Sequence, residues 1–213
     1  ILMGDLLEAV KNVQEHSSWF LMTAQRWNLD VGDLIDFGPG WEEKLLLDVS
    51  KNGSLSRFTG IDFWVYSKGL LQGMPPLAVG RIAFECWCLY KARAVQADLV
   101  DSTKVVVSVH QNHDYSHYPG GRAGIGTGLE AQRNRELVGG RPYFFIIKDR
   151  THILTKKGLR RARDGWRLWR GLRTSEVLPF SGPIPVKLFV KALNRIINAG
   201  RDCMLLVARG RRG

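Results

Sequence analysis

Apolar residues recur along this chain in two patterns. In some segments they appear at every third or fourth position, as in helices, and in others they lie closer together, as in strands. Helices are expected over residues 5–13, 41–49, 80–96, 130–137 and 186–197, and strands over 19–24, 58–66, 105–109 and 142–147. Turn signals such as Asn52-Gly53-Ser54 separate several of these segments. Strands that alternate with helices over this length predict an α/β fold with a mixed sheet flanked by helices.

The strand expected over 105–109 leads directly into the densest polar cluster of the sequence. Its valines are β-branched and nearly continuous, as in a strand covered on both faces. The candidate ligands that follow are His110, Asn112, His113 and Asp114. Loops that leave the carboxyl edge of an open α/β sheet converge on one crevice. His110, His113 and Asp114 could therefore share a divalent ion, and the alternative is a hydrogen-bonded structural loop.

Two acids stand in otherwise apolar surroundings. Asp62 is followed by Phe63 and Trp64, and Glu85 follows Phe84. A carboxylate among aromatic side chains is costly to bury unless it is paired or used. Each acid is therefore a candidate base or substrate ligand, while the alternative for Glu85 is a helix position that faces solvent. Trp64 could stack on a sugar ring or belong to the core.

Composition narrows the class of protein. The 213 residues are 45% hydrophobic and 24% charged, which fits one globular domain, or a domain plus an appendage, with a sizeable core. The opening residues read as neither a signal peptide nor a transmembrane segment. An odd count of three cysteines is no disulfide framework, which favours a reducing compartment and the cytoplasmic side. The glycine run over 124–128 lacks the spacing and the preceding strand of a phosphate-binding loop.

Charge is distributed unevenly along the chain. Residues 1–140 carry a net charge of −3, whereas residues 141–213 carry +14. We therefore expect a body over 1–150 and a basic helical tail over 151–213. Within it, residues 151–173 combine eight Lys and Arg with Trp166 and Trp169, as in an amphipathic helix that lies on an anionic membrane surface. The alternative is a basic face docked on the acidic body, and nucleic acid is not expected as a partner.

Three stretches together resemble the C-terminal half of glycosyltransferases of the GT-A fold, which use nucleotide-sugar donors. They are FLMTAQRWNLDV near residue 20, TGIDFWVYSKGLLQGMPPLAVGR from Thr59, and the following run that ends in HQNHDYSHYPGG. The resemblance spans about residues 19–121. Phe84-Glu85-Cys86-Trp87 stands where related sequences have Trp-Asp-Asn-Trp, so an acid is kept but lengthened by one methylene. The resemblance implies a partial GT-A sheet, with the donor-binding half expected before residue 1.

The resemblance also implies roles for single residues. Glu85 would be the general base that activates the acceptor hydroxyl, and His110 or His113 would contact a metal ion or the donor diphosphate. The residues expected to bind the acceptor are Asp62, Trp64, Arg81, Asn112 and Asp114. The complete enzyme is expected to need Mn²⁺ or Mg²⁺, because a divalent ion neutralises the leaving diphosphate. The fragment alone is expected to be inactive.

Two further hypotheses stay open at this stage. The first is a diverged glycosyltransferase-like module that binds or scaffolds without catalysis, and the second is a metal-dependent hydrolase built on His110, His113 and Asp114. The sequence predicts that the 58–66 and 105–109 strands share one sheet and that the 80–96 helix packs on it. It also predicts that Asp62, Glu85 and the histidine cluster meet in one crevice.

Overall fold

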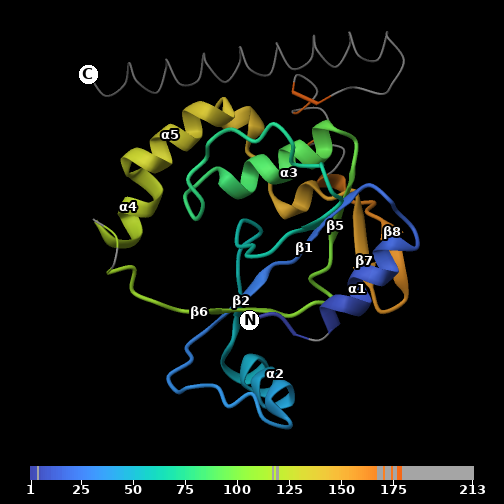
Figure 1. Cartoon of the computed structure of the whole chain (residues 1–213), viewed down its shortest axis with the longest axis vertical. Helices are drawn as coiled ribbons and strands as arrows, with labels where there is room; N and C mark the ends of the chain where they lie inside the picture. The colour runs from blue at the N-terminus through green and yellow to red at the C-terminus, as the bar shows by residue number, and fades with distance from the viewer. Residues whose placement is uncertain are drawn as a thin grey trace. The chain divides into compact units, whose positions relative to one another are not determined.

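The computed structural model describes residues 1–178 apart from residues 4, 117, 119, 167–169, 171–173 and 175–176. Its helices are α1 (Asp5–Gln14), α2 (Trp41–Asn52), α3 (Phe84–Ala94), α4 (Gly121–Thr127) and α5 (Leu129–Val138), with 3-10 turns η1 (Arg141–Tyr143) and η2 (Ile147–Asp149). Its strands are β1 (Phe20–Thr23), β2 (Arg26–Leu29), β3 (Ser54–Leu55), β4 (Val65–Tyr66), β5 (Asp98–Asp101), β6 (Ser108–Gln111), β7 (His152–Thr155) and β8 (Gly158–Arg161). The fold is α/β with mixed sheets flanked by helices, as predicted (Figure 1).

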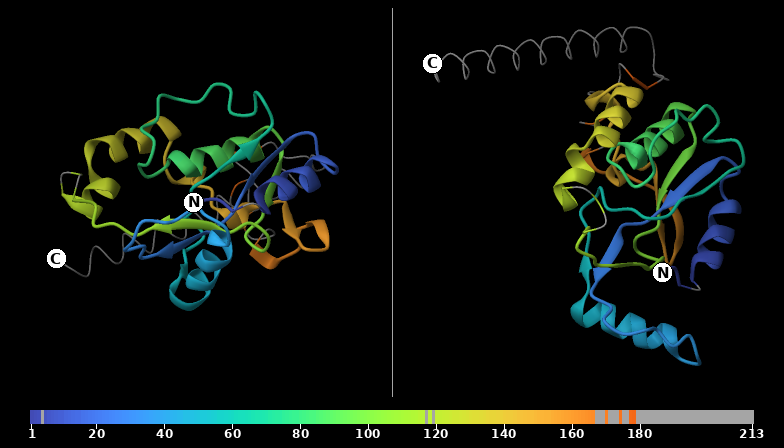
Figure 2. Two further views of the ribbon diagram at one scale, coloured as in Figure 1. Left: turned by 60° about the horizontal axis from the view of Figure 1, so that its bottom comes forward. Right: turned by 60° about the vertical axis from the view of Figure 1, so that its left-hand side comes forward.

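The larger sheet has five strands in the order β4-β1-β5-β7-β8, with β1, β5 and β7 parallel to one another. Phe20 and Met22 on one face join α1 in a core cluster with Ala9 and Val13. Alternation along β1 places Leu21 on the other face, which α3 covers. Figure 2 shows α1 and α3 on opposite sides of this sheet. The central strands are therefore buried on both faces, and helix α3 is fixed in place.

The smaller sheet has three strands in the order β3-β2-β6, and helix α2 covers one of its faces. Leu29 and Val109 pack there against Leu45 and Val49 of α2. The two sheets meet where β1 runs into β2. The parallel neighbours of β1 and β2 are β5 and β6, and the longer segment 102–107 connects these two. In this segment, Ser102 Oγ donates a hydrogen bond of 3.0 Å to the Thr23 carbonyl.

The prediction that the 58–66 and 105–109 strands share a sheet is wrong. Only Val65–Tyr66 of the first segment pairs, and it pairs with β1 in the larger sheet. The second segment pairs only from Ser108 onward, with β2 in the smaller sheet. The cause is the 102–107 segment, because the amides of Val105 and Val106 both turn back to the Ser102 carbonyl instead of joining a ladder. The expected packing of the helix on a sheet is confirmed for α3 against β1 and β5 of the larger sheet.

The 142–147 segment and the start of the basic tail also differ from expectation. Residues 142–147 form no strand, since the Ile146 amide donates to the Asp149 carboxylate at 2.8 Å rather than to a neighbouring strand. Residues 152–161 form the β7–β8 hairpin of the larger sheet rather than a helix. Ile153 pairs with Asp101 of β5 and with Arg160 of β8, and Leu154 pairs with Leu159 of β8. The first compact unit accordingly extends to Arg163, and the second covers Asp164–Gly213.

Most of the remaining expected tail lies outside the described residues, including the closing helix over 186–197, so contact with a membrane surface stays a prediction. Within the described ranges, no helix is both long and apolar enough to cross a lipid bilayer.

Candidate functional site

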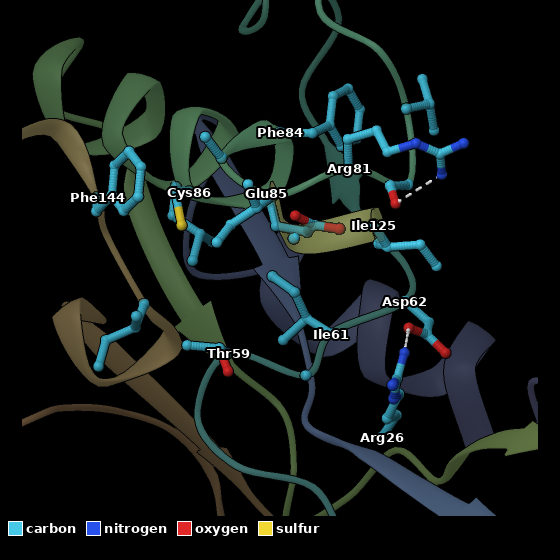
Figure 3. Close-up of a pocket in the computed structure, with 18 of the residues that line it drawn as sticks. Arg26, Thr59, Ile61, Asp62, Arg81, Phe84, Glu85, Cys86, Ile125 and Phe144 are labelled. Carbon is cyan, nitrogen blue, oxygen red and sulfur yellow. Dashed lines mark hydrogen bonds and ion pairs between the residues drawn. The ribbon is translucent and has the colours of Figure 1, made fainter. Parts of the chain in front are cut away.

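A hollow of about 810 Å³ lies beside the start of α3 and collects most of the predicted site residues. Its walls come from β2, the extended segment 58–64, residues 79–86, the loop after β6, helix α4 and residues 144–146. The predicted residues that line it are Asp62, Trp64, Arg81, Glu85, His110 and His113. Its volume falls within the range of small-molecule sites. Figure 3 shows the hollow with Glu85 above Ile61 and the Arg26–Asp62 pair at one side.

The pairing of β2 with β6 explains why polar side chains of both strands lie on one face of the smaller sheet. Asn28 pairs with His110, and Arg26 lies two residues before Asn28 on the same face. Trp27 and Val109 point to the opposite face, where they pack with α2. The apolar residues thus fix the register, and the register presents Arg26, Asn28 and His110 together.

Asp62 comes from the extended segment 58–64, and its side chain lies next to Arg26 and His110. Ile61 and Phe63 are buried, so the side chain between them turns outward. One carboxylate oxygen accepts a hydrogen bond from Arg26 Nη1 at 2.7 Å, and the other lies 2.8 Å from His110 Nδ1. The carboxylate therefore bridges a guanidinium and an imidazole, and both of its oxygens are engaged.

Protonation of His110 is disfavoured at this place. Burial lowers its pKa, and the positive charge of Arg26 lowers it further, although Asp62 acts in the opposite direction. The neutral ring must then carry its proton on Nδ1, because the carboxylate of Asp62 can only accept. Nε2 keeps its lone pair, and no described residue hydrogen-bonds to it.

Glu85 is the acid with the most perturbed surroundings in the hollow. It lies in the first turn of α3, partly buried, and its side chain reaches into the space between Arg81 and Ile61 (Figure 3). Burial raises its pKa, and the negative charge of Asp62 raises it further, while its own backbone amide and Arg26 lower it. The carboxylate forms no ion pair with a described residue. A carboxyl group whose pKa is raised by burial is a candidate for accepting a proton from a bound ligand.

Arg81 is held at the rim by three contacts. Its Nε donates to Glu130 of α5 at 2.7 Å, its Nη1 donates to the Gly80 carbonyl at 3.2 Å, and its guanidinium carbon lies 4.2 Å from the centre of the Tyr118 ring. The orientation of the guanidinium is therefore set by the α4–α5 region. Trp64 packs edge to face on Phe84, with ring centres 5.6 Å apart, so it belongs to the wall and to the core at once.

A second hollow of about 770 Å³ adjoins the first, and the two share Arg26, Thr59, Gly60, His110, His113 and Tyr115. Asn28, residues 54–57 and Asn112 line only this second hollow. The rings of His110 and His113 lie 5.6 Å apart between centres, and Tyr115 packs at 4.1 Å from His113. The histidine loop therefore forms the partition between two adjoining hollows.

Backbone strain is concentrated at this site. Ala83, with φ of +78°, and Tyr115, with φ of +62°, both line the first hollow, and Gln96 is the third described non-glycine residue in this region of φ. Such conformations cost roughly 1–3 kcal/mol each and persist where the surroundings enforce them. Their clustering at one cavity is typical of a functional site.

The expected convergence of Asp62, Glu85, His110 and His113 in one crevice is found, but Asp114 does not join them. Its carboxylate accepts a hydrogen bond of 3.0 Å from the Ser116 amide, and this bond holds the pKa of Asp114 below its usual value. Asp114 lines neither hollow and acts as a turn residue instead.

The sequence analysis missed Arg26, Cys86 and the wall formed by residues 144–146. Arg26 could have been found, because Arg26-Trp27-Asn28-Leu29 alternates polar and apolar residues as a half-buried strand does. Residues 144–146 reach the hollow through a chain turn that leaves no comparable pattern.

The predicted metal ligands do not form a complete site. Among the described residues, no group of three or more His, Cys, Asp or Glu side chains lies close enough together to hold one. His110 and His113 alone do not supply a ligand set. No protein-family model, no curated protein and no solved structure matches the chain.

Proposed function

We propose that the hollow around Glu85 is the acceptor site of a GT-A-type enzyme that transfers a sugar from a nucleotide-sugar to a hydroxyl group. The observation that carries this proposal is the Glu85 carboxylate, which is desolvated, unpaired among the described residues and directed into a cavity of ligand size. The resemblance of the surrounding sequence supports the choice of sugar transfer among reactions that need a base.

The proposed chemistry assigns one step to this chain. The oxygen of the acceptor hydroxyl attacks the anomeric carbon of the donor, and the bond from that carbon to the diphosphate breaks. Glu85 takes the hydroxyl proton as the new glycosidic bond forms, and the diphosphate leaves with the electron pair of the broken bond. A positioned base typically accelerates such a step about 10²–10⁴-fold.

The other cavity residues support binding of a polyol. Arg81 offers a guanidinium of fixed orientation at the rim, and Trp64 and Phe84 offer apolar surface beside Glu85. Sugars present alternating polar edges and apolar faces, so such a wall suits them. The resemblance implies a divalent ion as well, but the described residues do not form its ligand set, and no step is assigned to it here.

Cys86 provides a direct test of ligand entry, since it lines the hollow next to Glu85. Cys88 is buried, and burial together with the nearby Glu85 raises its pKa to about 12, so it should not react. Cys203 lies outside the described residues and would be replaced in a Cys203→Ser background. Iodoacetamide should then label Cys86 alone, and mass spectrometry after digestion would locate the label.

Saccharides that occupy the hollow should slow this labelling in proportion to their concentration. A panel of neutral mono- and disaccharides at millimolar concentration should include at least one protecting ligand. Glu85→Gln should preserve the protection, because the amide keeps the shape of the carboxylate. Labelling rates that no saccharide changes would count against an acceptor site in this cavity.

If the protein is a binding module without catalytic activity, a different result is expected for Glu85→Gln. Such a module would bind its ligand through the hollow without needing an ionisable group at position 85. Transfer activity that depends on Glu85 would exclude it, whereas protection of Cys86 without transfer by the complete protein would favour it.

A further inference from the structure

The Arg26–Asp62–His110 arrangement has a consequence that goes beyond binding at Glu85. We propose that Asp62 is a positioning residue, which holds His110 in the tautomer that presents an unprotonated Nε2 to a hydroxyl group of the ligand. Asp62 does not contact the acceptor itself in this assignment. It replaces the sequence-based expectation that Asp62 binds the acceptor and that His110 contacts a diphosphate.

The first step rests on the two hydrogen bonds that hold the Asp62 carboxylate. Its Oδ1 lies 2.7 Å from Arg26 Nη1, and its Oδ2 lies 2.8 Å from His110 Nδ1. Both bonds are charge-assisted and therefore stronger than neutral ones. Each oxygen has a second lone pair, but these two bonds orient the carboxylate toward Arg26 and the imidazole ring, which is the positioning role assigned to it.

The second step concerns the ring that Asp62 holds. A carboxylate accepts and never donates when it is ionised, so the facing Nδ1 must carry the hydrogen. In the neutral ring this leaves Nε2 as an acceptor, and hydrogen-bonding of one ring nitrogen to a carboxylate is a common way of fixing the role of the other. Arg26 supports the arrangement, since it donates to the other oxygen of Asp62 and its positive charge lowers the pKa of His110.

The third step concerns the ligand group that can bind to Nε2 of His110. A lone pair on Nε2 accepts from a hydroxyl but repels the oxygens of a phosphate. The charged and titratable groups near the ring are Asp62, Arg26 on β2, and His113 and Tyr115 in the loop after β6, while Glu85 lines another part of the same hollow. No described residue hydrogen-bonds to Nε2, so a hydroxyl is the matching ligand group.

The experiment measures the tautomer directly on the full chain. Two-bond proton–nitrogen NMR correlations at pH 8 distinguish a protonated Nδ1 from a protonated Nε2, and His113→Gln and His152→Gln help to assign the His110 signals. The expected result is Nδ1–H with a bare Nε2. A dominant Nε2–H form in the native protein would overturn the proposal.

Asp62→Asn tests the positioning role, because a carboxamide can donate as well as accept and no longer dictates the tautomer. The Nδ1–H form should lose its dominance in this variant. Asp114→Asn is the matched control, since Asp114 lies in the loop directly after the strand of His110 but bonds to Ser116. It should leave the His110 signals unchanged, and an equal effect of both variants would refute the assignment to Asp62.

A ligand comparison completes the test. Inorganic phosphate at 20 mM, with ionic strength matched by chloride, should leave the His110 Nε2 signal in place, and Mn²⁺ at micromolar concentration should not broaden it selectively. A protonated Nε2 in phosphate, or selective broadening by Mn²⁺, would assign the ring to a phosphate or to a metal instead.

This inference rests on the proposed function only for the identity of the hydroxyl-bearing ligand. The two can fail separately. Absence of saccharide protection at Cys86 with the Nδ1–H tautomer present would defeat the sugar-acceptor proposal and leave the role of Asp62 standing. The reverse result would defeat the role of Asp62 alone.

Discussion

Arg26 Nη1 lies 2.7 Å from the Asp62 carboxylate, although 36 positions separate the two residues in sequence. The pair ties strand β2 to the segment that crosses over the smaller sheet. It also sets the electrostatics of Glu85, because Asp62 raises and Arg26 lowers the pKa of that carboxyl. With the charges of Arg26 and Asp62 opposed, burial remains the largest influence on Glu85.

The first prediction concerns catalysis by Glu85. In a protein that contains this chain and transfers sugar from a nucleotide-sugar donor with Mn²⁺ or Mg²⁺, Glu85→Gln should lower kcat by about 10²–10⁴-fold and change acceptor KM much less. Glu43→Gln is the matched control, since Glu43 also lies in the first turn of a helix but is exposed. Release of nucleoside diphosphate measures turnover. Unchanged kcat in Glu85→Gln would remove the base assignment.

The second prediction is a dependence of stability on pH. In the folded protein the pKa of Glu85 is raised above its ordinary value of 4.5, so the folded state holds this proton to higher pH than the unfolded chain does. Below pH 4.5 both states are protonated and Glu85 has no effect. As the pH rises from 4.5 through the raised pKa, the free energy of unfolding should fall, and it should stay lowered above that.

Thermal unfolding of the Glu85→Gln variant reads out this effect. The variant should match the wild type below pH 4.5 and exceed it in Tm at neutral pH, because the amide carries no charge to desolvate. Glu43→Gln should follow the wild type throughout. A Tm difference for Glu85→Gln that does not vary with pH would contradict the expected cause.

Local patterns in the sequence predicted several elements of the core, but they missed strands β2, β5 and β7 and did not show how the strands are divided between sheets. Periodicity located α1, α2 and α5, because each buries a regular face, and a continuous apolar run located β1. The division of strands depended on the 102–107 segment. Its valines read as the start of a strand, while its backbone amides turn back to Ser102.

Sequence patterns identified the acids and histidines of the candidate site, but they did not predict which residues contact one another. Unusual residue types in apolar surroundings identified Asp62 and Glu85, and density of polar groups identified His110 and His113. The bond between Arg26 and Asp62 depends on tertiary placement, which no local spacing encodes. Asp114 was included because it adjoins the histidines, whereas its carboxylate serves a turn.

The third prediction tests backbone strain at the end of α3. Gln96 has φ of +58° directly after the helix, and the amides of Gln96 and Ala97 return to the carbonyls of Arg93 and Ala92. This is the hydrogen-bonding pattern of a helix end that favours glycine. Gln96→Gly should raise the free energy of unfolding by about 1 kcal/mol, or Tm by about 2–4 °C.

Gln96→Ala separates strain from loss of the side chain. Alanine has the same difficulty at positive φ as glutamine, so this variant should gain no stability. A comparable gain in both variants, measured by urea unfolding, would mean that the Gln96 side chain and not its backbone is the source of the effect.

The last prediction concerns the junction between the two sheets. Thr103 Oγ1 accepts a hydrogen bond of 2.9 Å from the Gln25 amide and donates one of 2.5 Å to Asp101. Thr103→Val keeps the shape of the side chain but leaves the Gln25 amide without its acceptor, which should cost about 1–3 kcal/mol in urea unfolding. Thr103→Ser keeps the hydroxyl and should lose less.

Because Gln25 directly precedes Arg26, Thr103→Val should also shift the His110 ring signals through Asp62, and Thr103→Ser should leave them in place. Identical His110 signals in all three proteins would show that the candidate site does not depend on this junction.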